Sequence, residues 1–353
     1  MLEGNIPKLY WLLVAAPVAV AAEWLHWSPI AVFGLSALTI VPLSAMLGRG
    51  TEELAARTGP TIGGLLNATL GNLAELIIAG FALRAGLIDL VKASITGSIL
   101  GNLLLVLGAA QLTGGLRYKT QTFNRQLATV NVPLLVMAAA GLIVPSLFLA
   151  AHPDPAHVAT VRMSEFVAVL LIVAYVLSLV YSMWTHKATF AESSEGHADD
   201  ATWSLAKTLV VLVAAAAGIG VMSEMLVGAT EEATRTLGLS EFFVGIILIP
   251  IIGNAAEHSS AVMMAYKNRM DLAVNIALGS TVQVALLVAP LLVFLGLIVG
   301  QPMDLAFTTF EVVAVTLAAW IASAIVLDGE SNWLEGAYLL VLYGILGVAF
   351  YFF

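Results

Sequence analysis

The sequence predicts an all-α, polytopic membrane protein of about eleven transmembrane helices that contains an inverted-topology repeat of five helices. Three observations support this prediction: the composition, the succession of apolar segments, and a polar motif that occurs twice. Of the 353 residues, 60% are hydrophobic and only 10% are charged, whereas a soluble domain has about 25% charged residues. Because the chain has no cysteine, a disulfide framework and a thiolate metal site are excluded.

The apolar segments define the expected helices, because about 20 apolar residues span the hydrocarbon core of a bilayer. We expect them near residues 9–26, 29–48, 61–83, 87–111, 127–149, 163–185, 204–228, 241–265, 271–299, 304–326 and 333–353. Trp residues near their ends, such as Trp24, Trp27, Trp203 and Trp333, are typical of membrane interfaces.

Lysine and arginine predict the orientation, because cytoplasmic loops retain positive charge. With the N-terminus inside, four of the 14 basic residues lie outside, namely Arg84, Lys92, Arg162 and Arg235. The other ten lie on or near the cytoplasmic side. We therefore expect a multi-pass protein with a cytoplasmic N-terminus, in a prokaryotic inner membrane.

The chain divides into four parts. Residues 1–28 form an extra N-terminal transmembrane helix, 29–186 the first repeat, 187–201 a cytoplasmic linker and 202–353 the second repeat. The linker is acidic, and it is interpreted either as a solvated connector or as a segment that attracts cations. The net charge of −9 is spread along the chain without a basic block, which excludes a nucleic-acid partner.

The repeat is visible in a motif that recurs at an offset of 182 positions (253 − 71). Gly71–Glu75 reads GNLAE and Gly253–Glu257 reads GNAAE. The same offset carries Asp89 onto Asp271 and Ser98 onto Ser280. The two motifs lie five spans apart, so the two copies cross the membrane in opposite directions. Such inverted repeats are typical of secondary transporters whose substrate site lies near the midplane.

Glu75 and Glu257 are the leading site candidates, because a carboxylate within an apolar helix costs roughly 2.5 kcal/mol or more. Asn72 and Asn254 each precede the glutamate by three residues and share its helical face. Further polar residues follow on the next segments, namely Ser98, Asn102, Ser280 and Gln283. Oxygen ligands of this kind are those that calcium prefers. The alternative interpretation is that these groups hydrogen-bond neighbouring helices.

Three further residues have two interpretations each. His258 is either a proton-sensitive partner of Glu257 or a structural residue, since adjacent helical residues point about 100° apart. Glu224 and Glu311 either line a cation or proton pathway or are carboxylates at helix ends.

With these motifs, the chain resembles the cation/proton exchanger family of the calcium/cation antiporter superfamily. The resemblance rests on stretches around both glutamates and on the two segments that follow them, namely Gly71–Ile78, Gly97–Leu104, Pro250–His258 and Gly279–Gln283. It extends over nearly the whole length. It implies that Glu75 and Glu257 bind the cation and the competing protons, with the six polar residues named above nearby.

The resemblance implies a secondary antiporter, not an enzyme, that exchanges calcium for protons by alternating access. Calcium, protons and membrane lipid are the expected partners, a homo-oligomer is left open, and no cofactor is expected beside the transported calcium. The alternatives are a sodium/calcium or other divalent cation exchanger and a cation channel. Val284 lies opposite Asn102 in the second copy, where sodium/calcium exchangers have a carboxylate, which favours protons as the counter-ion.

Overall fold

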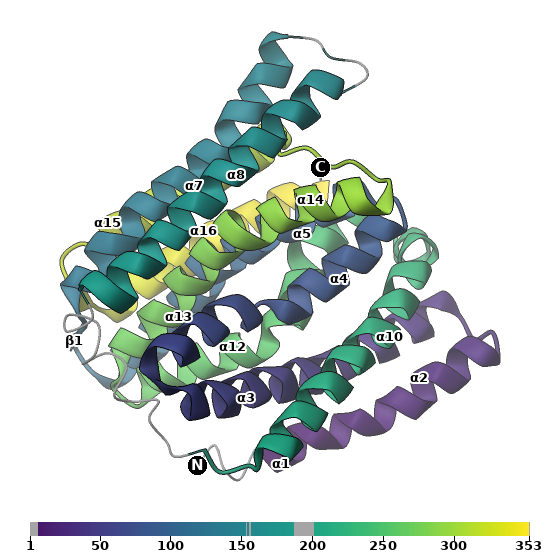
Figure 1. Ribbon diagram of the computed structural model, residues 1–353, viewed down its shortest axis with the longest axis horizontal. Helices are drawn as coiled ribbons and strands as arrows, with labels where there is room; N and C mark the ends of the chain where they lie inside the picture. The colour runs from purple at the N-terminus through teal and green to yellow at the C-terminus, as the bar shows by residue number, and fades with distance from the viewer. Residues whose placement is uncertain (1–5, 153, 155–156, 187–200, 353) are drawn as a thin grey trace.

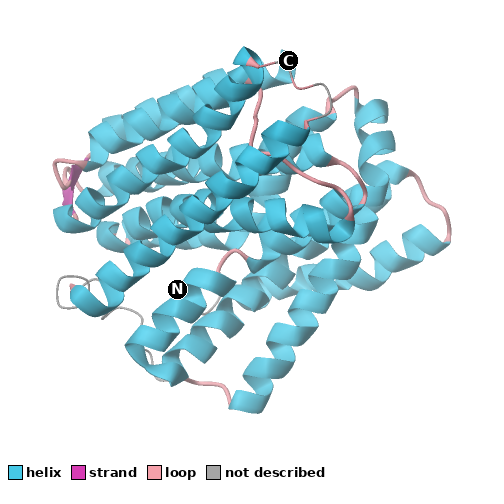
Figure 2. Cartoon of the chain, turned by 45° about the horizontal axis from the view of Figure 1, so that its top comes forward, coloured by secondary structure: helices cyan, strands magenta, loops and turns pink. Residues whose placement is uncertain are grey.

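The computed structural model describes residues 6–152, 154, 157–186 and 201–352. Nearly all of them are helical, apart from connections and one short pair of strands (Figure 2). In that pair β1, Gln121–Thr122, runs antiparallel to β2, Glu330–Ser331. The predicted linker 187–201 lies almost wholly outside the described residues.

The first half of the chain begins with a helical run made of α1 (Ile6–Tyr10), the 3-10 segment η1 (Trp11–Val14) and α2 (Ala15–Trp24). The helices that follow are α3 (Pro29–Leu70), α4 (Leu73–Arg84), α5 (Ile88–Leu100), α6 (Leu107–Arg117), α7 (Arg125–Ala151) and α8 (Val158–Val180). π-helical segments follow α5 and α8, namely η2 (Gly101–Val106) and η3 (Tyr181–Thr185).

The second half comprises α10 (Leu205–Leu237), α11 (Glu241–Phe243), α12 (Ile249–Tyr266), α13 (Met270–Gln283), α14 (Ala289–Val299), α15 (Thr309–Val326) and α16 (Trp333–Phe352). Its π-helical segments are η4 (Val244–Leu248) and η5 (Val284–Val288).

Ten helices of the described residues are long and apolar enough to cross a membrane. The remaining predicted segment corresponds to residues 6–24, which η1 divides into shorter helices. Two predicted limits need correction. The second segment continues to Gly59 and not only to residue 48, while the third, Ile62–Arg84, is a separate span beyond a bend at Gly59, where φ is 79°. The tenth helix begins at Thr309 and not at residue 304, because the apolar residues before it are buried in an extended connection.

The repeat extends to the limits of the helices. The offset of 182 carries α6, Leu107–Arg117, onto α14, Ala289–Val299, and it carries η2 onto η5 to within one residue. It also carries the last residues of α4, ending at Arg84, onto the end of α12 at Tyr266. The two copies therefore share these helix limits as well as their motif.

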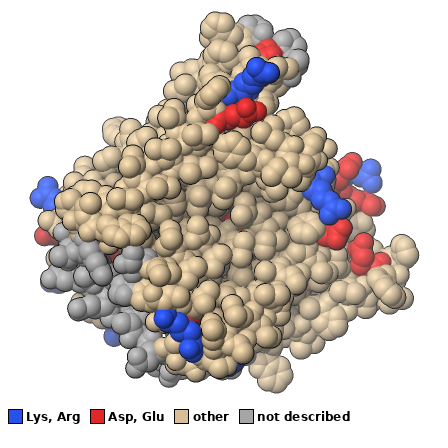
Figure 3. Space-filling model, viewed as in Figure 1, with Lys and Arg blue, Asp and Glu red and all other residues tan. Residues whose placement is uncertain are grey.

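The motif helices α4, α5, α12 and α13 lie in the middle of the molecule, with α2, α3 and α10 on one side (Figure 1). On the other side α7 and α8 form a hairpin whose end projects beyond the remaining helices. Charged residues lie mainly near the edges of the face in Figure 3, which leaves a broad uncharged surface. Such a surface suits hydrocarbon, where exposed charges are costly.

Candidate functional site

The site lies where α4 of the first half meets α12 of the second. Glu75 occupies the first turn of α4, and a Cβ added to Gly253 on α12 would lie 3.5 Å from the Glu75 Cγ. This distance is an ordinary van der Waals contact, so the two motifs lie against each other. Glu75 therefore lies against the second motif, in which Glu257 follows Gly253 by four residues on the same helix.

Asn72 lies at a break between α3 and α4. The backbone leaves helical geometry at Asn72, with a φ of −97° and a ψ of 25°, and the Asn72 side chain is buried at 3% exposure. Its Nδ2 donates a hydrogen bond of 2.5 Å to the Oε1 of Gln283, the last residue of α13. An amide from each half is thus paired across the centre of the protein.

The corresponding residues of the second half are bonded differently. Ser280 on α13 donates a hydrogen bond of 2.5 Å to the Oε2 of Glu257. Asn254, which is 1% exposed, donates from Nδ2 to the Pro250 carbonyl at 3.1 Å. The helix α12 is continuous through Gly253 and Asn254, whereas the first copy is interrupted at Asn72.

The helix α5 and the segment η2 contribute Ser98 and Asn102, which are 4% and 1% exposed. Ser98 and Glu75 line a small cavity with Ser94, four apolar or proline residues completing the wall. Asn102 lies in the π-helical segment η2. All eight predicted binding residues therefore lie on the four motif helices or their immediate ends.

Two buried acceptor oxygens of the site, Asn72 Oδ1 and Glu75 Oε1, have no hydrogen-bond partner among the residues that the structure describes. A buried acceptor without a donor is costly, and a cation would satisfy it. No group of three or more His, Asp or Glu side chains in the described ranges is arranged to hold a metal. A divalent ion here would therefore be bound by the two carboxylates together with neutral oxygens.

The three remaining candidate residues, Glu224, Glu311 and His258, differ in how deeply they are buried. Glu224 is exposed on α10. Glu311 is 2% exposed and completes the capping box of α15 with Thr308, while Thr96 of α5 donates to its Oε1 at 2.9 Å. His258 is partly buried on α12, next to Glu257 in sequence.

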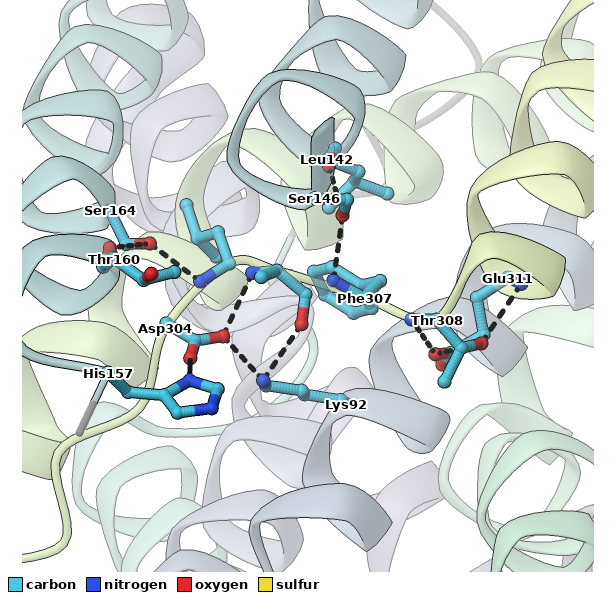
Figure 4. Close-up of polar contacts among 12 residues, drawn as sticks. Lys92, Leu142, Ser146, His157, Thr160, Ser164, Asp304, Phe307, Thr308 and Glu311 are labelled. Carbon is cyan, nitrogen blue, oxygen red and sulfur yellow. Dashed lines mark hydrogen bonds and ion pairs between the residues drawn. The ribbon is translucent and has the colours of Figure 1, made fainter. Parts of the chain in front are cut away.

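A buried connection, part of which sequence reasoning placed within a helix, anchors the start of α5. In the Gly300–Thr308 connection, Asp304 Oδ1 accepts from Lys92 of α5 at 2.5 Å, and Asp304 Oδ2 lies 2.8 Å from His157 Nδ1 (Figure 4). The backbone N–H groups of Leu305 and Phe307 donate to Ser164 of α8 and Ser146 of α7. The connection therefore ties α5 to the α7–α8 hairpin.

The electrostatics of Asp304 are set by this network. Burial raises the pKa of the Asp304 carboxyl. The charge of Lys92 and the hydrogen bonds from Lys92 and His157 lower the pKa by more than burial raises it, so the pKa lies below its usual range. Asp304 is thus held in its ionised form.

Comparison with known proteins agrees with this geometry. The family model for the sodium/calcium exchanger protein matches residues 28–184 and 207–352. A Ca2+/H+ antiporter of Aphanothece halophytica is 44% identical over 97% of this chain and 95% of its own length. One of Bacillus subtilis is 41% identical over 98% and 99%.

Among solved structures, native YfkE superposes with a TM-score of 0.85 at 38% identity, covering 98% of this chain and all of that one (100%). The H+/Ca2+ exchanger CAX, at 18% identity and a TM-score of 0.76 over 99% of this chain and 92% of its own, shows the shared fold. The chain therefore belongs to the sodium/calcium exchanger family, among its cation/proton exchangers.

Proposed function

We propose that this protein exchanges calcium for protons across a membrane, and that Glu75 and Glu257 bind both ions in turn. The observation that carries the proposal is the contact between Glu75 and the motif of the second half, which contains Glu257 at the position equivalent to Glu75. The bacterial relatives support the proposal, because they are named Ca2+/H+ antiporters.

The chemistry follows from charge balance. Two ionised carboxylates neutralise one calcium ion, and amide and hydroxyl oxygens complete its coordination, since calcium takes six to eight oxygen ligands. Asn72, Asn254, Ser98, Ser280, Asn102 and Gln283 are the proposed source of these oxygens. Protons on the same glutamates remove the charge that holds calcium. The site therefore holds either ion but not both, which couples the two fluxes.

The counter-ion is proposed to be the proton and not sodium. Val284, which the repeat places opposite Asn102, is 1% exposed and offers no oxygen. A sodium/calcium exchanger remains the alternative on the same scaffold. Replacing sodium and then potassium by an inert cation, at a fixed pH gradient, separates the two: calcium uptake into proteoliposomes should not change.

The proposed orientation keeps the N-terminus in the cytoplasm of a prokaryotic cell, with the protein in the inner membrane. The distribution of Lys and Arg supports it. Lipid is proposed to cover the exposed apolar side chains of α8, such as Phe166 at 74% and Leu170 at 64% exposure.

The decisive experiment replaces each glutamate separately. Glu75→Gln and Glu257→Gln keep the shape of the side chain but remove its charge and its ability to carry a proton, so pH-driven calcium uptake should be lost. Glu23→Gln, at the exposed end of α2, is the control. Uptake within about twofold of wild type in either site variant, equivalent to less than about 0.5 kcal/mol, would remove that residue from the site.

A further inference from the structure

A small cavity lies beside Glu75, on the side of the membrane where α4 ends and α5 begins. It measures about 10 Å3, and its polar lining comes from Glu75, Ser94 and Ser98. This volume is close to the minimum that holds one water molecule, which also needs two to four polar partners. Three of the seven lining residues carry side-chain oxygens.

The residues that line the cavity show on which side of Glu75 it lies. Ile78 and Ala79 come after Glu75 on α4, Ser94 comes before Ser98 on α5, and Pro250 comes before Asn254 on α12. These displacements all point to the side where α4 ends and where α5 and α12 begin. The Gly300–Thr308 connection lies on that side too, since it binds Lys92 near the start of α5. The proposed orientation makes it the outer side.

The Ser94 hydroxyl donates one hydrogen bond to the backbone and can still accept another. Ser94 Oγ donates its hydrogen to the Val91 carbonyl at 2.8 Å, and a hydroxyl oxygen can also accept. Glu75 Oε1 is buried and has no partner among the described residues. A water molecule between them can donate one hydrogen to each oxygen.

The second half offers no equivalent. Ser94, Ser98 and Asn102 recur every four residues, whereas the same register in α13 and η5 places Ile276, Ser280 and Val284. A hydroxyl at this position of the repeat is therefore a feature of the first half, where it lines the same cavity as Glu75.

We infer that Ser94 is a positioning residue that holds one water molecule against Glu75 Oε1, and that this water is the first step of proton exchange between Glu75 and the outer side. The inference rests on the proposed calcium/proton exchange. Ser94 acts through the water and does not itself ligate calcium.

The test compares Ser94→Ala with wild type in proteoliposomes. The variant should slow pH-driven calcium exchange at saturating calcium by about fivefold, the factor that corresponds to one typical hydrogen bond. Calcium affinity at alkaline pH should not change. The control is Ser178→Ala on α8, because Ser178 makes the same kind of bond, to the Tyr175 carbonyl at 2.7 Å.

Infrared difference spectroscopy gives a readout apart from transport. The carbonyl band of protonated Glu75, identified by its loss in Glu75→Gln, should move to higher frequency in Ser94→Ala, because a hydrogen bond to the carboxyl group is lost. An unchanged rate, an unchanged band, or a fall in calcium affinity as large as the fall in rate would each overturn the inference. If wild type itself shows no calcium uptake after a pH jump, the proposed function fails instead.

Discussion

At the scale of single residues, His258 is the titratable side chain adjacent in sequence to the site. It follows Glu257 on α12 and is partly buried. Because adjacent helical residues point about 100° apart, His258 lies off the face that Asn254 and Glu257 share. This direction favours a structural role over a share in the proton load.

His258→Asn tests that role, since asparagine keeps a polar group but does not titrate. The midpoint of the pH profile of calcium transport should stay where it is in wild type. Stability should fall by about 1 kcal/mol or less, the usual value of one polar contact inside a membrane protein. Ser259→Ala is the control, since Ser259 is exposed and bonds its own helix backbone. A shifted midpoint with intact calcium binding at alkaline pH would assign proton transfer to His258.

Sequence reasoning selects the proposed site residues but does not predict the hydrogen bonds between them. An offset of 182 identifies Glu75 with Glu257 and Ser98 with Ser280, because these residues occupy equivalent positions. The bond between Asn72 and Gln283 joins positions that are not equivalent, since Gln283 corresponds to Gly101. Such a contact depends on how the two halves pack together, and no local pattern contains that information.

At the scale of the elements, α6 and α16 pack backbone against backbone. A Cβ on Gly336 would lie 2.3 Å from the Leu112 nitrogen and 2.6 Å from the Gly108 oxygen. Gly336→Ala should therefore force the helices apart and destabilise the protein by about 1–3 kcal/mol, as overpacking typically does.

Thermal unfolding in detergent measures this effect. Gly344→Ala is the matched control, because Gly344 lies on the same helix and a Cβ there meets nothing within 4 Å. Equal unfolding midpoints for the two variants would contradict the close packing of α6 and α16.

The Gly300–Thr308 connection makes a second prediction at this scale. Asp304 and Lys92 are buried, with 5% and 13% exposure of their side chains. Asp304→Asn leaves the Lys92 charge without its carboxylate, and removing one partner of a buried pair costs about 3 kcal/mol or more. The exposed turn residue Asp328, changed to Asn, is the control.

The acid dependence of stability should change as well. The pKa of Asp304 is lowered in the folded protein, so the carboxylate contributes its full stability above the unfolded pKa of about 3.9. That contribution is lost as the pH falls through the lower folded-state value. Wild type should therefore lose this stability on acidification and Asp304→Asn should not, as unfolding midpoints between about pH 7 and 3 will show. Parallel acid curves would exclude Asp304 as a stabilising anion.

Hydropathy identified the elements themselves but placed the start of α15 too early. Leu305, Ala306 and Phe307 are buried, and hydrophobicity alone does not distinguish a buried extended segment from a helix. The signal that marks the true start is Thr308 with Glu311, a capping box.

At the scale of the whole molecule, the proposed orientation can be tested by chemical labelling. The chain has no cysteine, so a single introduced thiol reacts without background. In right-side-out vesicles, a membrane-impermeant maleimide should label Arg235→Cys, near the end of α10, at once. It should label Lys119→Cys, after α6, only when the vesicles are permeabilised. The opposite pattern would reverse the orientation.

One difference between the halves affects how the molecule as a whole changes state. The helix before Glu75 is broken at Asn72, while the equivalent Asn254 lies inside the continuous helix α12. One motif therefore adopts two backbone shapes in one chain, and the two copies run in opposite directions. If the halves exchange these shapes, the molecule presents its present arrangement to the opposite side of the membrane. The shape of each half thus predicts the shape that the other half takes in the second state. A structure of that state is best compared by superposing its first half on the second half described above.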